Sequence, residues 1–310
     1  MAQKIIVIVG PTAVGKTALS IEVAKQFNGE VISGDSMQVY RGLDIGTAKV
    51  TTEEMQGIRH HLIDILNPGE NFSVADFQYR VRECISDIHS RGKHVIIAGG
   101  TGLYIQSVLY DYHFSEQARS SAYHQKIEDE IKKDGIQSVY NRLKMVDPDQ
   151  AAKIHPNNER RLIRALEIYD RTGITMSEQQ EQQNESIYDH YIVGLEMDRT
   201  ILYNRINQRV DDMLKKGLVN EVQQMVDQGL ENTQAMRGIG YKEILPYVKE
   251  EVPLEQAVEL LKRNSRRFAK RQYTWFRNKM NVHWYDILPE TKDEVFQNIL
   301  TDLEGFFRKK

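Results

Sequence analysis

The segment at residues 10–17, Gly-Pro-Thr-Ala-Val-Gly-Lys-Thr, most constrains what this chain can fold into. It fits G-x-x-x-x-G-K-[ST] at every fixed position, after an apolar run at residues 5–9 and before a helical pattern. In such a loop the glycines let backbone N–H groups close round phosphate oxygens, the lysine reaches the terminal phosphate, and the hydroxyl binds Mg²⁺. The segment predicts a polyphosphate site with Thr17 as metal ligand and Mg²⁺ as cofactor. Its binding residues are Gly10, Pro11, Thr12, Ala13, Val14, Gly15, Lys16 and Thr17.

The first third of the chain alternates short apolar runs with helical patterns. Apolar runs lie at residues 5–9, 31–33 and 95–98, and helical patterns lie at 16–27 and 73–91. The last of these is well marked, because Ser73 and Asp76 form a capping box. Alternation of this kind predicts an α/β fold, with a P-loop parallel sheet flanked by helices.

The strand signal disappears between residues 115 and 185, where helical patterns dominate, and returns at residues 191–195. We therefore predict a helical insertion domain over 115–185. The rest of the chain, 1–114 and 186–310, is predicted to form one P-loop α/β catalytic core with C-terminal basic helices. The run at 191–195 is expected to rejoin the first sheet.

Composition sets the expected class of protein and its location. With 310 residues, of which 40% are hydrophobic and 27% charged, the chain can bury a full core. Its start has neither a basic region nor a long apolar stretch, so we expect no membrane association and a cytoplasmic location. The sequence gives no sign of an obligate protein partner, and we expect a monomer. The net charge of −3 gives no indication of nucleic-acid binding.

A P-loop identifies a polyphosphate but not which one. Most such loops serve ATP or GTP. However, the apolar strand at residues 94–98 ends in Gly99-Gly100-Thr101, where many NTPases place a metal-binding aspartate. The missing carboxylate weakens an NTPase interpretation. A small-molecule or nucleotide kinase, and a non-enzymatic RNA-binding module driven by NTP occupancy, stay as alternatives.

Two charged residues are placed to act on a ligand in this loop. Asp35 follows the strand at 31–33, at the carboxyl edge where parallel sheets hold their ligands. It is therefore expected to face the P-loop, although a metal ligand or a helix cap is the alternative. Arg209 lies on the same helical stripe as Leu202, Ile206 and Met213. An inward-facing arginine needs an anion, either a bound diphosphate or an internal carboxylate.

Two predicted helices concentrate basic residues on one face. In the helix from Leu254, an apolar stripe of Ala257, Val258, Leu261, Phe268 and Trp275 lies opposite Arg263, Arg266, Arg267, Lys270 and Arg277. In the insertion, Leu162, Leu166 and Tyr169 lie opposite Arg160, Arg164 and Arg171, and Gly173 is placed to end the helix. Either face alone is often a solvated surface, but two of them beside a polyphosphate site favour RNA.

Several motifs occur in order along the chain. They are SGDSMQVYRGLDIGTAK at 33–49, GGTGLY at 99–104, IHPN at 154–157, RRLIRALE at 160–167, GIGY at 238–241 and AKRQYTWF at 269–276. With the P-loop they resemble the bacterial tRNA dimethylallyltransferase family over nearly the whole chain.

The resemblance implies transfer of a dimethylallyl group from dimethylallyl diphosphate to N6 of the adenosine just 3′ of the anticodon in tRNA. It implies that Asp35 accepts a hydrogen bond or proton from the adenine amine, and that Thr101 and Arg209 steady the departing diphosphate. A prenyltransferase acting on free adenosine nucleotides is the nearest alternative. The residues expected to contact tRNA are Asp35, Ser36, Met37, Gln38, Thr101, Arg160, Arg161, Leu162, Ile163, Arg164, Arg237, Gly238, Ile239, Gly240, Tyr241 and Lys242, with Arg266 and Arg267 added from the basic helix.

Overall fold

The structure is a computed structural model that describes residues 3–110, 112, 121–181 and 186–308. The chain divides into two compact units. One consists of Met1–Leu109 with Ile187–Lys310, and the other is Tyr110–Ser186. The predicted insertion, 115–185, lies within the second unit. In the parts of the chain that the structure describes, no helix is long and apolar enough to cross a bilayer.

A parallel six-stranded sheet forms the centre of the first unit, in the order β3-β2-β4-β1-β5-β6. The innermost strands read as continuous apolar runs because helices cover both faces of the sheet. In β1, for example, five of the six residues are buried. The strands are β1 (Lys4–Val9), β2 (Gly29–Ser33), β3 (His60–His61), β4 (His94–Ala98), β5 (Asp189–Glu196) and β6 (His283–Asp286).

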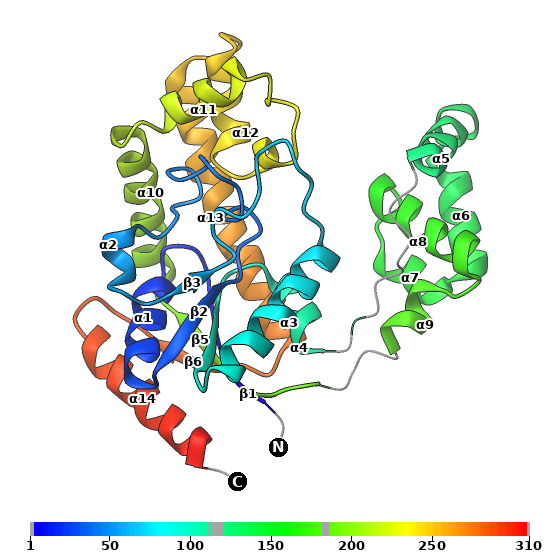
Figure 1. Cartoon of the computed structure of the whole chain (residues 1–310). Helices are drawn as coiled ribbons and strands as arrows, with labels where there is room; N and C mark the ends of the chain where they lie inside the picture. The colour runs from blue at the N-terminus through cyan, green and yellow to red at the C-terminus, as the bar shows by residue number, and fades with distance from the viewer. Residues whose placement is uncertain (1–2, 111, 113–120, 182–185, 309–310) are drawn as a thin grey trace. The chain divides into compact units, whose positions relative to one another are not determined.

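Helices from distant parts of the chain pack on the sheet (Figure 1). Alternate residues of β1, Ile6 and Ile8, join a core cluster with Leu19 and Val23 of α1 and with residues of the C-terminal helix α14. On the other side of the sheet, α3 contacts β4 and packs on α4. These helices are α1 (Lys16–Gln26), α3 (Val74–Ser90), α4 (Gly102–Leu109) and α14 (Lys292–Arg308).

A second group of helices lies near the carboxyl ends of the strands and supplies one side of the site described below. The short helix α2 follows the long loop after β2, while α10 packs on α13, and α12 packs on both α11 and α13 (Figure 1). The bounds are α2 (Thr52–Met55), α10 (Arg199–Lys215), α11 (Leu218–Asp227), a 3₁₀ turn η1 (Ala235–Arg237), α12 (Tyr241–Val248) and α13 (Leu254–Lys279).

The second unit is helical and has a core of its own. Apolar residues from its longer helices, including Ile127, Leu143 and Leu166, form one buried cluster. Gly173, with φ 71°, ends α8 in the left-handed conformation that glycine adopts without a Cβ clash. The helices are α5 (Ser121–Asp134), α6 (Ile136–Val146), α7 (Pro148–Lys153), α8 (Glu159–Thr172) and α9 (Met176–Glu181).

The predicted fold class is confirmed: the protein has a parallel sheet flanked by helices. The capping box of Ser73 and Asp76 begins α3, and the run at 191–195 belongs to β5, which pairs with β1. Two strands, β3 and β6, were not predicted. Both are short and start with histidine, and neither shows the apolar run that marks a central strand.

Candidate active site

The P-loop joins β1 to α1 with the backbone that the glycine pattern predicts. Gly10 and Gly15 have φ values of 142° and 117°, which side chains rarely permit. A Cβ on Gly10 would lie 2.6 Å from the carbonyl oxygen of Leu195. No side chain caps the start of α1, so its first N–H groups are available to an anion. The ammonium of Lys16 donates to the carbonyls of Gly10 (2.9 Å) and Pro11 (2.7 Å), across the loop.

A cavity of about 720 Å³ opens beside this loop. Its walls combine the P-loop with the carboxyl ends of β2 and β4 and with side chains of α10 and α13. All three predicted catalytic residues, Asp35, Thr101 and Arg209, line it. So do these predicted contacts of the base or RNA: Ser36, Met37, Gln38, Arg237, Gly238, Ile239 and Lys242.

Lys16 and Arg209 line the cavity together with two carboxylates, those of Asp35 and Glu54. Burial, reinforced by the positive charge of Arg209, lowers the pKa of Lys16 to about 7, while Asp35 acts in the opposite direction. Burial also lowers the pKa of Arg209, and Asp35 again opposes the shift. The positive charge of Arg209 therefore disfavours the charged form of Lys16 in the absence of an anion. A buried site with this much positive charge favours the binding of an anion.

Asp35 is oriented by its own backbone turn. The Met37 N–H donates to Oδ1 of Asp35 at 2.8 Å. This bond fixes the carboxylate just past β2. Because the residue lines the cavity, the predicted position at the carboxyl edge of the sheet is confirmed.

Gln272 was quoted within a motif but not predicted as a site residue, and it is central to the geometry. It lies on α13 with an exposed fraction of 6%. Its Oε1 accepts from the Thr12 N–H at 2.9 Å, and its Nε2 donates to the Gly100 carbonyl at 3.1 Å. A second long side chain, Arg205 of α10, donates from Nε to the Ala13 carbonyl at 3.0 Å. No sequence period reveals these contacts, because they join segments far apart in the chain.

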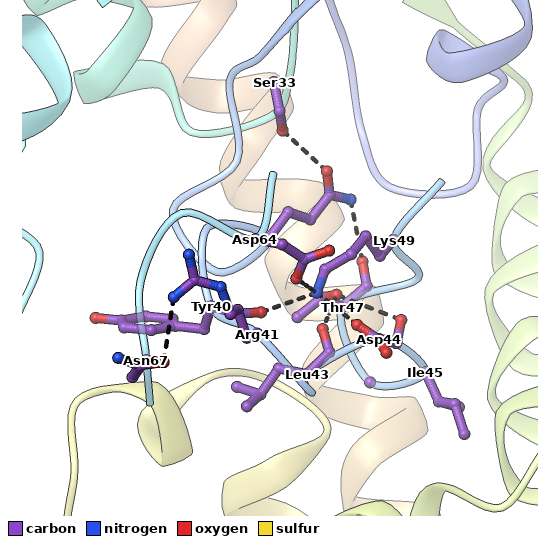
Figure 2. A network of polar contacts seen from close by, with 12 residues as sticks. Ser33, Tyr40, Arg41, Leu43, Asp44, Ile45, Thr47, Lys49, Asp64 and Asn67 are labelled. Carbon is purple, nitrogen blue, oxygen red and sulfur yellow. Dashed lines mark hydrogen bonds and ion pairs between the residues drawn. The ribbon is translucent and has the colours of Figure 1, made fainter. Parts of the chain in front are cut away.

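The loop after β2 carries a network of polar contacts (Figure 2). Lys49 donates to the carbonyl of Tyr40 (2.8 Å) and pairs with Asp44 and Asp64 at 2.5 Å each. The Lys49 side chain is only 6% exposed, so these partners satisfy its charge. The network fixes the loop that forms one wall of the cavity.

The predicted basic face of α13 is only partly free. Arg267 and Lys270 are exposed. In contrast, Arg266 donates to Asn207 (2.6 Å), and Arg277 pairs with Glu196. The predicted apolar stripe is also displaced, because the buried residues are Ala257, Leu261, Ser265, Ala269, Gln272 and Phe276. Phe268 instead lines the cavity, and the edge of Trp275 packs against Gly102.

Four of the predicted RNA contacts are buried and do not line the cavity. Leu162 and Ile163 have exposed fractions of 0% in the core of the helical unit, so their side chains cannot touch RNA. Tyr241 is equally buried, and its hydroxyl donates to Glu221. These residues belonged to motifs taken as whole segments, although a helix turns every third or fourth residue inward. Gly240 is buried as well, next to Gly46.

The arginines of α8, the helix that carries Leu162 and Ile163, divide into two groups. Arg160 and Arg161 are exposed. Arg164 pairs with the carboxylate of Glu167 at 2.7 Å, and Glu167 is 1% exposed. Since a buried carboxylate requires a partner, Arg164 has a structural role in this unit.

Comparison with known proteins decides the family. The family model described as IPP transferase matches residues 38–279, which is most of the chain. The chain belongs to the IPP transferase family.

Relatives in this family match over nearly their full lengths. The chain is 58% identical to "tRNA dimethylallyltransferase" of Oceanobacillus iheyensis, covering 100% of this chain and 99% of that one. It is 55% identical to the protein of the same name from Bacillus cereus strain AH187, covering 99% and 96%.

Solved structures of IPP transferase relatives have the same fold. The tRNA isopentenylpyrophosphate transferase of Bacillus halodurans has a TM-score of 0.75 at 48% identity, over 98% of this chain and 96% of that one. A eukaryotic dimethylallyltransferase, described as acting on tRNA, has a TM-score of 0.86 at 32% identity, over 100% of this chain and 80% of that one.

Proposed function

We propose that this enzyme transfers a dimethylallyl group from dimethylallyl diphosphate to N6 of the adenosine just 3′ of the anticodon in tRNA, and releases diphosphate. The observation that carries the proposal is that Lys16, Arg209 and Asp35 line one cavity with the P-loop. Family relatives at 55% and 58% identity that are named tRNA dimethylallyltransferase support it.

The diphosphate is proposed to bind between the P-loop and Arg209. Backbone N–H groups at the start of α1 and the ammonium of Lys16 contact its oxygens from one side. The guanidinium of Arg209, whose fork suits phosphate oxygens, contacts them from α10. An anion here favours the charged form of Lys16, whose pKa is lowered to about 7 without one. Ligand binding and protonation of Lys16 are therefore coupled.

The site suits Mg²⁺ if the bound diphosphate supplies part of the coordination. Thr17 is exposed and lines the cavity at the start of α1, where its hydroxyl can coordinate a cation. Within the described ranges, no group of three acidic, histidine or cysteine side chains is placed to hold a metal ion. Mg²⁺ would thus be held by Thr17, diphosphate oxygens and water, as is usual for this ion. When bound, it would neutralise charge on the diphosphate.

The reaction exchanges one bond for another. The bond between the terminal carbon of the dimethylallyl group and the diphosphate oxygen breaks, and its electron pair leaves with the diphosphate. The lone pair of adenine N6 forms the new C–N bond, and the carboxylate of Asp35 takes the N6 proton. An exocyclic amine is a poor nucleophile, so base assistance of this kind is worth about 10² to 10⁴ in rate.

Charge that develops on the leaving diphosphate is proposed to be stabilised by fixed donors. Arg209 and Thr101 line the cavity from two different segments, α10 and the loop after β4. Gln272 holds Gly100, the residue before Thr101, against the P-loop through its bonds to Gly100 and Thr12. Donors that are oriented before the reaction stabilise the transition state without reorganising.

Transfer RNA is proposed to bind through exposed basic residues. Arg237 and Lys242 lie at the cavity and Arg267 on α13. Arg160 and Arg161 offer the same chemistry on the helical unit, which we propose also contacts tRNA. Because the amine must enter the cavity, the adenosine is expected to leave its stack. This costs about a few kcal/mol, and the cost is lower for a base in a loop.

One assay tests this function against its alternatives. The protein is mixed with unmodified tRNA, Mg²⁺ and dimethylallyl diphosphate, and the mass of the RNA is measured. We expect the RNA to gain one dimethylallyl group. In a parallel reaction with AMP in place of tRNA, we expect little transfer. No gain in mass together with rapid ATP consumption would instead indicate a kinase. Preferential prenylation of AMP would indicate an enzyme acting on free nucleotides.

We also propose that the enzyme acts as a monomer in the cytoplasm, where its proposed substrate is found. Asp35, Lys16 and Arg209 all come from the first unit of a single chain, which supports a monomer. Light scattering after gel filtration tests the oligomeric state.

A further inference from the structure

One carboxylate, that of Glu221 on α11, collects four hydrogen bonds. Its Oε2 accepts from the N–H groups of Asp44 (3.0 Å) and Ile45 (2.8 Å), and its Oε1 accepts from the Gly46 N–H (3.0 Å). The hydroxyl of Tyr241 donates to the same Oε1 at 2.6 Å. Glu221 is 7% exposed, so solvent cannot readily replace these partners.

Tyr241 supports this arrangement from α12. Burial, with Glu221 nearby, raises the pKa of Tyr241, so its hydroxyl keeps the proton that it donates. Its ring lies under Gly46, because a Cβ at that position would be 2.6 Å from Cζ of Tyr241. Only a glycine at position 46 lets the backbone approach this closely.

The segment that Glu221 holds leads directly to the cavity. Gly46, Thr47 and Ala48 all line it. The carbonyls of Thr47 and Ala48 accept from Nε2 of Gln38, at 3.3 Å and 3.4 Å. These bonds set which way the amide of Gln38 faces, and Gln38 lies in the cavity three residues after Asp35.

The other end of the Gln38 amide is also fixed. Its Oε1 accepts from the hydroxyl of Ser33, the last residue of β2, at 2.9 Å, and Figure 2 draws this bond as the dashed line that starts at Ser33. The two bonds from Nε2 use both of its N–H groups, but Oε1 keeps one acceptor position for a ligand. A carboxamide oxygen of defined orientation can accept from the N6 amino group on the edge of an adenine.

We propose that Glu221 is a positioning residue for the nucleobase: it holds residues 44–46 so that the next two carbonyls orient Gln38 beside Asp35. The inference rests on the proposed function, since it concerns the adenosine of that reaction. Glu221 itself does not line the cavity. It acts through the backbone, and its effect is on the base rather than on the diphosphate.

The test compares Glu221→Gln with the matched control Glu251→Gln, which changes an exposed glutamate. A glutamine can still accept from Asp44 and Ile45, but its NH₂ then opposes the Gly46 N–H. We expect kcat/KM for tRNA to fall about tenfold or more, the factor for losing a charge-assisted hydrogen bond. Kd for inorganic diphosphate should stay within a factor of about two. The control should match wild type in both.

Two further measurements separate positioning from a general loss of structure. Amide hydrogen exchange should accelerate at Gly46 in Glu221→Gln, while the amides of β1 keep their protection. Tyr241→Phe removes one of the four donors and should give a smaller loss for tRNA in the same direction. A parallel loss of diphosphate affinity in both variants would overturn the proposal, because it would indicate a loosened fold.

The outcome also distinguishes this inference from the function on which it rests. Wild-type protein that transfers no dimethylallyl group to tRNA would overturn the proposed function. An active wild type, with Glu221→Gln unchanged in kcat/KM for tRNA, would overturn only the role of Glu221.

Discussion

The side-chain amide of Gln272 donates to the carbonyl of Gly100 at 3.1 Å, and this bond ties α13 to the end of β4. The same side chain accepts from Thr12 of the P-loop at 2.9 Å. Gln272 therefore sets the spacing between the P-loop and the end of β4, the two segments proposed to bind the diphosphate. Neither segment is near it in sequence.

Gln272→Ala should weaken binding of dimethylallyl diphosphate. The substitution removes two hydrogen bonds of about 1 kcal/mol each, so we expect KM for this substrate to rise roughly tenfold or more. KM for tRNA should change little. Steady-state kinetics with each substrate varied in turn measures both, and Gln256→Ala, an exposed glutamine of the same helix, is the control. An equal rise in both KM values would contradict this role.

Gly100→Ala should lower kcat/KM only while Gln272 is present. A Cβ on Gly100 would lie 2.0 Å from Nε2 of Gln272, whereas the nearest atom outside that side chain is 3.6 Å away. The double variant Gly100→Ala/Gln272→Ala should therefore be no less active than Gln272→Ala alone. A double-mutant cycle on kcat/KM checks this non-additivity. Additive losses would show that Gly100 is constrained by something else.

Asp35→Ala should reduce turnover far more than binding. If the carboxylate takes the N6 proton, kcat should fall by about 10² to 10⁴. Single-turnover kinetics and a tRNA binding titration measure the two effects separately. Equal losses of turnover and RNA affinity would make Asp35 a binding residue instead.

Binding of inorganic diphosphate should be linked to a proton on Lys16. Burial and Arg209 lower the pKa of Lys16 to about 7, and the bound anion raises it. Near neutral pH the complex should take up a proton at Lys16, and affinity should fall as pH rises above about 7 and the free lysine loses its charge. Calorimetry in buffers of different ionisation enthalpy measures the uptake. Lys16→Met should lack this component, and identical uptake in both proteins would refute it.

Arg267→Ala should weaken tRNA binding and its dependence on salt. Arg267 is exposed on α13, so loss of one phosphate contact should reduce the slope of log K against log salt by about 0.7 to 0.9. Arg266→Ala should have a smaller effect, because that guanidinium is bonded to Asn207. Arg308→Ala, at the far end of α14, is the control. An unchanged slope for Arg267→Ala would remove this helix face from the interface.

Local signals explain why the sheet and the phosphate loop were predictable. The apolar run of β1 and the glycine pattern after it carry their own conformational requirements, and Ser73 caps α3 through residues adjacent in sequence. In the site, the position of Asp35 after a strand placed it at the sheet edge, and helical periodicity placed Arg209 on the inward-facing side of its helix. It did not find Gln272 or Glu221, because an isolated polar residue on a helix does not reveal its partner.

By itself, the sequence determined the class of fold, the phosphate loop and the family, since each depends on short motifs and on the periodicity of apolar residues. Only the tertiary structure decided which motif residues face the cavity and which are buried. Leu162 and Tyr241 lie within motifs yet have no exposed surface, while Glu221 lies outside them and holds a cavity wall. The reason is physical: hydrogen bonds between distant segments depend on how helices pack, and packing is a property of the whole fold.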